Sequence, residues 1–362
     1  MGTLSADNYV STENMQQDFA GIKDAISLPS SGTAVEFQVG DILISNIRPY
    51  LKKIWLSDRN GGCSTDVLSL RTKNEKVDSA FLYCCLANDD FVSYVMSGAK
   101  GVKMPRGDKQ HISSFNLGVP SVQEQRKIAG LISLLEKRIS TQSKIIEELK
   151  TLRSVLVDTY IKDANSKKSN QTIISLGNYG SFVRGLTYSS ADVTDDTSKT
   201  GVVRSNNLEY GSPVDTTSSL VYVNKNPVLE QRLVKGDIVI CMANGSSSLV
   251  GKASYYQGGY DNMTVGAFCG IYRGSHPLAK WIFMSSAYCK AVANAIQGGN
   301  GAIANLHGED ILSMNFVVPS DQNRTTALYQ LLYLYDSKIQ IAEEELVGFI
   351  EQKQFFLRKM FI

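Results

Sequence analysis

The sequence reads GDILI at positions 40–44 and GDIVI at positions 236–240. In each copy a Gly-Asp turn leads into an apolar run typical of a buried strand. A second motif follows each strand in the same order, as SFNLGVPS at 114–121 and as SMNFVVPS at 313–320. Because both motifs recur in the same order, the chain is interpreted as a tandem repeat of one domain type.

Each repeat ends in a long segment whose apolar residues are spaced alternately by four and by three positions. This spacing predicts long helices that pack along a partner helix. The predicted seam consists of Ile128, Ile132, Leu135, Ile139, Ile146, Leu149 and Leu156 in the first helix and of Leu328, Leu332, Tyr335, Ile339, Leu346, Phe349 and Phe356 in the second. The two sets keep one register throughout, which two independent cores would not require. We therefore expect the helices to pack against each other in antiparallel fashion.

Each globular copy is predicted to be mixed α/β. Strands are expected at 67–70 and 270–272, and helices at 80–95 and 278–296. The predicted fold class is thus α+β (mixed α/β), with two similar domains, a long antiparallel two-helix coiled coil and pseudo-two-fold symmetry. The predicted segments are a first domain at 1–120, a central spacer helix at 121–162, a second domain at 163–319 and a C-terminal spacer helix at 320–362.

The composition indicates globular domains without a strong charge. Lys and Arg number 37 against 35 for Asp and Glu, so any basic surface must come from local clustering. The 6 cysteines contain no CxxC pair, and the 3 histidines lie far apart, so we expect free thiols and no metal site. No signal peptide or membrane-length apolar run is present, which favours a cytoplasmic protein without membrane contact.

Several loops combine basic and amide side chains, which suits contact with DNA. A glycine-rich loop follows the predicted helix of each copy, basic at 97–109 and amide-rich at 297–307. Arg and Lys can bond guanine edges or phosphates, and Asn can bond adenine. For any single residue, a solvated surface position is an equally good interpretation. The candidate DNA-binding residues are Arg48, Lys52, Lys53, Lys103, Arg106, Lys109, Arg184, Arg204, Asn206, Asn207, Asn244, Lys252, Asn300 and Asn305.

These elements, in this doubled order, resemble the specificity (S) subunit of type I restriction-modification systems. The resemblance is carried by the repeated GDI strand, VPSVQEQ at 119–125, the helix with Ile128, Leu135 and Ile139, and the opening of the second half at 176–187. It implies two target-recognition domains that each read one half of a split DNA sequence. The coiled coil between them would serve as spacer and docking surface.

The resemblance also implies partners and cofactors. The S subunit is not an enzyme. It recruits two adenine methyltransferase (M) subunits, which use S-adenosylmethionine, and through them the restriction (R) subunits, which use ATP. In agreement, no Asn/Asp-Pro-Pro-Tyr/Phe methylation motif is found. The glycines at 245 and 251 with Lys252 fall short of a phosphate-binding loop, because the spacing is one residue too long and no Ser or Thr follows the lysine.

The two copies differ in one respect. The stretch 176–203 of the second copy has no counterpart in the first, which we expect to lack a strand and a glycine-rich turn. The first domain is therefore abridged, or the gene is truncated, or another chain supplies the element.

Three classes of function are compared. A DNA-specificity subunit accounts for the duplication, the shared helix register and the loop chemistry. The alternative is a coiled-coil structural or interaction scaffold without DNA specificity, which would show no duplex preference and no copurifying methyltransferase. An enzyme would need a catalytic constellation that the sequence does not display.

Overall fold

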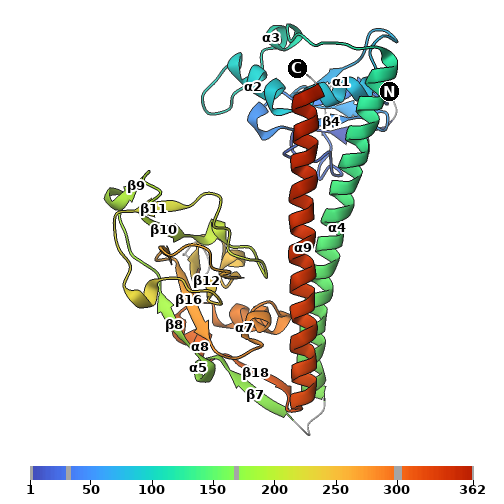
Figure 1. The fold of residues 1–362 in the computed structure, drawn as a ribbon. Helices are drawn as coiled ribbons and strands as arrows, with labels where there is room; N and C mark the ends of the chain where they lie inside the picture. Colours follow the sequence, from blue (N-terminus) through green and yellow to red (C-terminus); the bar gives the residue numbers. More distant parts are fainter. Residues whose placement is uncertain (1–2, 30–33, 167–170, 297–303, 361–362) are drawn as a thin grey trace. The chain divides into compact units, whose positions relative to one another are not determined.

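The computed structural model describes residues 3–29, 34–166, 171–296 and 304–360 and divides the chain into two compact units. Unit 1 comprises Met1–Ile145 with Ala342–Ile362, and unit 2 comprises Ile146–Ile341. Each unit therefore contains part of both long helices, α4 (Val122–Ser166) and α9 (Gln322–Met360), which are drawn in Figure 1. Within each unit, residues of the long helices pack on the globular core.

The described part of unit 1 contains two three-stranded sheets, with the orders β1-β5-β2 and β4-β3-β6. The GDILI motif forms the end of a turn and then β3, the fully buried central strand of the second sheet. The strands are β1 (Tyr9–Val10), β2 (Val35–Phe37), β3 (Ile42–Ser45), β4 (Ile54–Leu56), β5 (Gly61–Cys63) and β6 (Val67–Leu70).

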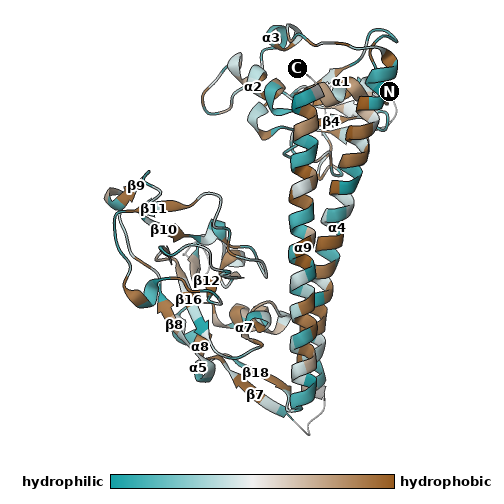
Figure 2. Cartoon of the chain, in the orientation of Figure 1, coloured by the Kyte–Doolittle hydropathy of each residue, from teal (hydrophilic) through white to brown (hydrophobic). Residues whose placement is uncertain are grey.

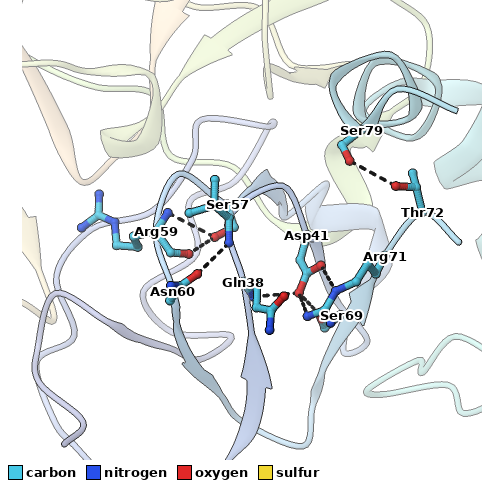
Figure 3. A network of polar contacts seen from close by, with 10 residues as sticks. Gln38, Asp41, Ser57, Arg59, Asn60, Ser69, Arg71, Thr72 and Ser79 are labelled. Atoms are coloured by element: carbon cyan, nitrogen blue, oxygen red, sulfur yellow. Dashed lines mark hydrogen bonds and ion pairs between the residues drawn. The ribbon is translucent and has the colours of Figure 1, made fainter. Parts of the chain in front are cut away.

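A buried carboxylate holds the turn before β3 (Figure 3). Asp41 accepts hydrogen bonds from Arg71 at 2.6 Å (Nε to Oδ1) and 2.7 Å (Nη2 to Oδ2), and from the Gln38 N–H at 2.8 Å. Gly40 has φ +87°, a left-handed conformation that side chains rarely adopt. The Gly-Asp pair is therefore required by the backbone of this turn.

Unit 2 repeats this turn in detail. Asp237 accepts from Arg273 at 2.8 and 2.7 Å and from the Val234 N–H at 2.8 Å, and Gly236 has φ +99°. The comparison of the two repeats identified the Gly-Asp pairs but not their arginine partners. Arg71 follows β6 and Arg273 lies near the end of β16, so each arginine is far in sequence from its Gly-Asp pair.

The predicted helix at 80–95 is in fact two helices, α1 (Ser79–Leu86) and α2 (Asp89–Ser97). Asn88 separates them because it caps the N-terminus of α2: its Oδ1 accepts a hydrogen bond from the Phe91 N–H at 2.9 Å. A short α3 (Lys109–Ser113) completes the globular part of unit 1, and η1 (Pro49–Leu51) follows β3.

The helix predicted at 278–296 is likewise divided in unit 2, into α6 (Ala279–Ile282) and α7 (Ser286–Ala295). Ser285 causes the break, because its side chain accepts from the Tyr288 N–H at 3.1 Å and caps α7. Unit 2 also contains the short helices α5 (Leu176–Tyr179) and α8 (Gly308–Leu312).

The described part of unit 2 has the sheet orders β15-β10-β11-β9, β14-β12-β16-β8, β13-β17 and β18-β7. The GDIVI motif leads into β12, which is fully buried and pairs with β14 and β16. The strands are β7 (Gln171–Ser175), β8 (Gly180–Arg184), β9 (Val193–Thr194), β10 (Thr200–Val203), β11 (Val221–Val223), β12 (Ile238–Cys241), β13 (Ala243–Asn244), β14 (Ala253–Tyr255), β15 (Met263–Val265), β16 (Cys269–Gly274), β17 (Ala304–Asn305) and β18 (Asn315–Pro319).

In unit 1, α4 and α9 run antiparallel. Gln142 donates to the Ala342 carbonyl at 3.0 Å, and Lys353 pairs with Glu136 at 2.7 Å. A lower residue number on α4 is thus paired with a higher residue number on α9, as antiparallel helices require. In unit 2 the same order holds, with Arg153 bound to Asp336 at 2.5 Å and Asp163 to Arg324 at 3.0 Å.

All predicted seam positions are buried or half-buried. Ile132, Leu135, Ile146, Leu332 and Ile339 are buried, and the remaining nine are half-buried. Figure 2 shows hydrophobic residues recurring along both helices. The seam is not the whole apolar surface, because Ala129 and Leu357 pack on the core of unit 1 around Phe81, and Val157 and Ile161 join the core of unit 2.

The fold class is as predicted, a mixed α/β chain with two globular parts and an antiparallel helix pair. Within the described residues, no helix is long and apolar enough to span a membrane.

Candidate nucleic-acid interface

In unit 1 the loop after β3 meets the glycine-rich loop after α2. Arg106 forms isolated antiparallel bridges with Ile47 and Lys100, and the Arg48 N–H donates to the Pro105 carbonyl at 2.8 Å. We call residues 45–53 and 98–109 loop pair 1. Arg48 and Arg106 are both exposed on this bridge, so two guanidinium groups lie on neighbouring backbone segments.

The backbone of loop pair 1 is strained at Arg48. Its φ of 50° and ψ of 62° are left-handed values, and Lys52, at the other end of η1, has φ 55° and ψ 41°. Left-handed conformations of residues other than glycine are unfavourable and concentrate at functional sites. The strain therefore marks this loop as a candidate site.

Unit 2 builds the same bridge from different side chains. Strand β13 pairs with β17 so that Ala243 faces Asn305 and Asn244 faces Ala304. Asn244 corresponds to Arg48, because the two residues lie at the same distance after the repeated strand. Asn305 corresponds to Arg106, because Asn305 pairs with Ala243 as Arg106 pairs with Ile47. We call residues 243–252 and 304–307 loop pair 2.

The two loop pairs thus present different donors from one backbone arrangement. Asn305 is exposed, and Asn244 is half-buried with its Nδ2 3.4 Å from the Ser205 hydroxyl and its Oδ1 accepting from the Ser246 N–H. The contact with Ser205 brings the loop at 204–207 beside loop pair 2. Guanidinium groups stand in unit 1 where carboxamides stand in unit 2.

Of the predicted DNA-binding residues of unit 1, some have exposed side chains and others form ion pairs or hydrogen bonds within the unit. Lys103 and Lys109 are exposed. Lys52 forms an ion pair with Asp89 at 2.7 Å, and Arg106 lies 3.1 Å from Asp66. Lys53 donates to the Thr12 carbonyl at 2.6 Å, so its ammonium group fastens two loops together instead of extending from the surface.

Among the predicted residues of unit 2, Arg184 and Asn206 are exposed, and Lys252 is half-buried. Arg204 is half-buried, and its Nη2 donates to the Ser219 carbonyl at 3.2 Å. Asn300 lies outside the described residues.

The prediction for Asn207 needs correction, because this side chain is buried. Its Oδ1 accepts from the Arg204 N–H at 3.0 Å, and its Nδ2 donates to the Ser218 carbonyl at 2.8 Å. Asn14 does the same in unit 1, where its Oδ1 accepts from the Ser11 N–H at 2.7 Å. A carboxamide in this place stabilises a turn in both units and is unavailable to DNA.

Sequence reasoning missed the acidic partners of the basic loops. Asp66 and Asp89 come from other parts of unit 1, and no local pattern links them to their basic partners. Asp108 pairs with Lys100 at 2.6 Å inside the loop itself, and this bond together with the N–H groups of α3 lowers the Asp108 pKa to about 2. Local acids therefore offset part of the positive charge of loop pair 1.

The thiols are free, and no group of three or more His, Cys, Asp or Glu residues able to hold a metal ion occurs within the described ranges.

Three comparisons with known proteins bear on this chain. Residues 8–151 match the family model of the type I restriction modification DNA specificity domain. The chain is 32% identical over 148 residues to the type I restriction enzyme StySPI specificity subunit of Salmonella potsdam, covering 38% of this chain and 30% of that protein. It is 32% identical over 147 residues to the EcoKI specificity subunit of Escherichia coli K12, with the same two coverages. The chain thus matches less than a third of the length of these two relatives.

The fold has solved counterparts. The S subunit of a type I restriction-modification system from M. genitalium aligns with 99% of this chain and 90% of its own, with a TM-score of 0.56 and 15% identity. A chain from a structural study of complex assembly and conformational transition of the type I R-M system aligns with 97% and 90%, with a TM-score of 0.51 and 16% identity. Residues 8–151 therefore resemble the type I restriction modification DNA specificity domain, and the chain shares its fold with solved S subunits of type I restriction-modification systems.

Proposed function

We propose that this chain is the non-catalytic DNA-recognition subunit of a type I restriction-modification complex and reads a split duplex target. Unit 1 contacts one part of the target with loop pair 1, and unit 2 contacts the other with loop pair 2. One observation carries the proposal: the same loop bridge occurs in both units with different side chains on it. A repeated scaffold with altered donors is what two readers of different sequences require.

The donors suggest which bases each unit prefers. A guanidinium group can donate two hydrogen bonds to O6 and N7 of guanine, which suits Arg48 and Arg106. A carboxamide can both donate and accept on the edge of adenine, which suits Asn244 and Asn305. We therefore expect guanine in the half-site of unit 1 and adenine in that of unit 2. Lys103, Lys109 and Arg184 hold phosphates, which position the protein without selecting bases.

The long helices supply the surface for partner subunits. Several apolar side chains on α4 and α9 point away from the seam and are exposed, among them Leu134 at 61%, Leu334 at 58% and Ile341 at 57%. Exposed apolar side chains that recur along a helix are typical of protein interfaces. The partners proposed are two adenine methyltransferase subunits and, through them, the restriction subunits. S-adenosylmethionine and ATP belong to those partners, and the complex acts in the cytoplasm.

Selection from a pool of random DNA duplexes by the reconstituted complex tests the proposal. We expect a split motif, guanine-containing in one half and adenine-containing in the other. Binding should weaken as salt rises, because each phosphate contact releases counterions. A pool without an enriched motif would instead support the alternative, a scaffold without DNA specificity.

Paired variants assign the halves. Arg48→Ala and Arg106→Ala should relax selection in one half alone, with a loss of about 1–3 kcal/mol for each base contact removed. Asn305→Ala should relax the other half. Lys73→Ala, which removes an exposed positive charge outside loop pair 1 and the long helices, is the matched control and should leave both halves intact. Equal loss in both halves from any loop variant would contradict the assignment of one unit to each half.

A further inference from the structure

Each unit has one residue directly before the strand, β6 or β16, that pairs with the repeated Gly-Asp strand. In unit 1 this residue is Asp66, and in unit 2 it is Phe268. The register is the same in both units, because the first residue of β6 or β16 faces the last residue of β3 or β12. Asp66 and Phe268 therefore occupy equivalent places, which we call the flanking position.

In unit 1 the flanking position lies beside the loop bridge. The Asp66 carbonyl accepts from the Asn46 N–H at 2.8 Å, and the next residue, Ile47, pairs with Arg106 across the bridge. The side chains of Asp66 and Arg106 also meet, because the carboxylate lies 3.1 Å from the guanidinium group, and both remain partly exposed. Asp66 therefore presents an acceptor next to the donors of Arg106.

In unit 2 the same backbone arrangement carries an aromatic ring. The Phe268 carbonyl accepts from the Met242 N–H at 2.8 Å and from the Ala243 N–H at 3.2 Å. Ala243 in turn faces Asn305 across the bridge. The Phe268 side chain is 65% exposed, although burial of such a ring would be favourable. An apolar ring is thus held at the surface beside the bridge that carries the carboxamide of Asn305.

The residue types at the flanking position and on the bridge fit the two bases of one pair. In a G·C pair, cytosine presents an amino donor in the major groove beside the guanine acceptors, and a carboxylate can accept from it. In an A·T pair, thymine presents a methyl group beside the polar edge of adenine, and an apolar side chain can contact it. Asp66 with Arg106 thus matches G·C, and Phe268 with Asn305 matches A·T. The opposite combination would leave the amino group or the methyl group without a matching side chain.

We propose that the flanking position reads the pyrimidine of the base pair whose purine is contacted by the bridge residue. Asp66 accepts a hydrogen bond from the amino group of cytosine, and Phe268 covers the methyl group of thymine. This inference rests on the proposed function and deepens it, because Arg106 and Asn305 bind the purines there. It assigns specificity to two residues outside loop pair 1 and loop pair 2.

Removal of a single methyl group from the DNA tests Phe268. The probe is the duplex that the reconstituted complex selects, with deoxyuridine replacing one thymidine at a time in the unit 2 half. One replacement should weaken binding by wild type about fourfold, the effect expected for burying one methyl group. Phe268→Ala should bind the unmodified duplex more weakly and should not distinguish thymidine from deoxyuridine at that position. Phe268→Leu, which keeps an apolar side chain, should restore the discrimination.

Tyr260→Ala is the matched control for Phe268→Ala. It removes an exposed aromatic ring that follows β14 at the opposite end of β12, and it should discriminate as wild type does. If Asn305→Ala relaxes selection at adenine but no deoxyuridine weakens binding, the proposed function stands and this inference is wrong. If the complex selects no motif at all, the proposed function fails and this inference fails with it.

Exchange of both readers tests whether the two places are sufficient. Phe268→Asp together with Asn305→Arg gives unit 2 the pair of side chains found in unit 1, and it should change the selected base pair from A·T to G·C. Asn305→Arg alone should select guanine less strongly, because Phe268 offers no acceptor to the amino group of cytosine. Continued selection of A·T by the double variant, or equal selection of guanine by the single and double variants, would contradict the assignment.

Discussion

At the scale of single residues, the repeat preserves a buried charge together with its partner. Asp41 and Asp237 are each 1% exposed, and each accepts two hydrogen bonds from one arginine and one from a backbone N–H. A carboxylate is tolerated inside a protein when such bonds replace its water. The Gly-Asp signature is therefore a structural requirement of the fold.

Asp41→Asn should lower the free energy of unfolding by about 1–2 kcal/mol. Hydrogen bonds to charged groups contribute about 1.5–3 kcal/mol, and the half-exposed Arg71 reduces this through solvent screening. The control is Asp58→Asn, which removes an exposed acid paired with Arg59 in the same unit and should change stability by less than about 0.5 kcal/mol. Urea unfolding measures both, and equal losses would mean that burial of Asp41 is unimportant.

The same carboxylate makes stability depend on pH. Burial opposes ionisation of Asp41, yet the bonds from Arg71, Gln38 and Ser69 keep its pKa below the ordinary 3.8. A lowered folded-state pKa contributes stability above the unfolded pKa, and this contribution is lost as pH falls through the folded value. The stability difference between wild type and Asp41→Asn should therefore shrink as pH is lowered from about 5 to about 3. If the stability difference between wild type and Asp41→Asn did not change with pH, ionisation of Asp41 would not be the cause of the pH dependence.

At the scale of elements, the long helices depend on backbone propensity as well as on their seam. Gly348 lies inside α9, where a Cβ would meet nothing within 4 Å, so Gly348→Ala should raise stability by up to about 1 kcal/mol. Gly236→Ala is the contrasting variant, since it also has open space but a φ of +99°. It should lower stability, and thermal unfolding of the two variants should give shifts of opposite sign.

A buried ion pair joins the helices in unit 2. Arg153 is 3% exposed and donates to Asp336 at 2.5 Å and to the Gly211 carbonyl at 2.8 Å, while Lys280 also contacts Asp336 at 2.8 Å. Arg153→Ala should cost about 3 kcal/mol, because removing one partner leaves buried polar groups unpaired.

Arg324→Ala breaks a solvent-exposed pair with Asp163 and should cost less than about 1 kcal/mol. A loss from Arg153→Ala no larger than this control, measured by urea unfolding, would show that the buried pair adds little.

The helices and the repeated strands were predictable from the sequence because their signals are periodic or duplicated. The seam from Ile128 to Leu156 follows one spacing rule, and β3 and β12 share a motif. The breaks at Asn88 and Ser285 were missed because a capping side chain interrupts an otherwise apolar helical pattern. Asn207 was misjudged because composition cannot show whether a carboxamide bonds to its own backbone or reaches the surface.

At the scale of the whole molecule, the accessibility of the cysteine thiols shows whether the core of each unit is shielded from solvent. Cys63, Cys84 and Cys85 are buried in unit 1, and Cys241 and Cys269 are buried in unit 2, whereas Cys289 is exposed. Burial raises the pKa of Cys63 to about 11 and those of Cys84 and Cys85 to about 12, and it also raises those of Cys241 and Cys269. Five thiols are therefore both covered and protonated at neutral pH.

Since the thiolate is the reactive form, a disulfide reagent should modify one cysteine rapidly in the native protein and the other five only on unfolding. Cys289→Ser should abolish the rapid phase. Under increasing urea, identification of the modified peptides by mass spectrometry should then separate the cysteines of unit 1 from those of unit 2 if the units unfold independently. Rapid native modification of Cys84 or Cys241 would contradict the closed cores on which both loop pairs rest.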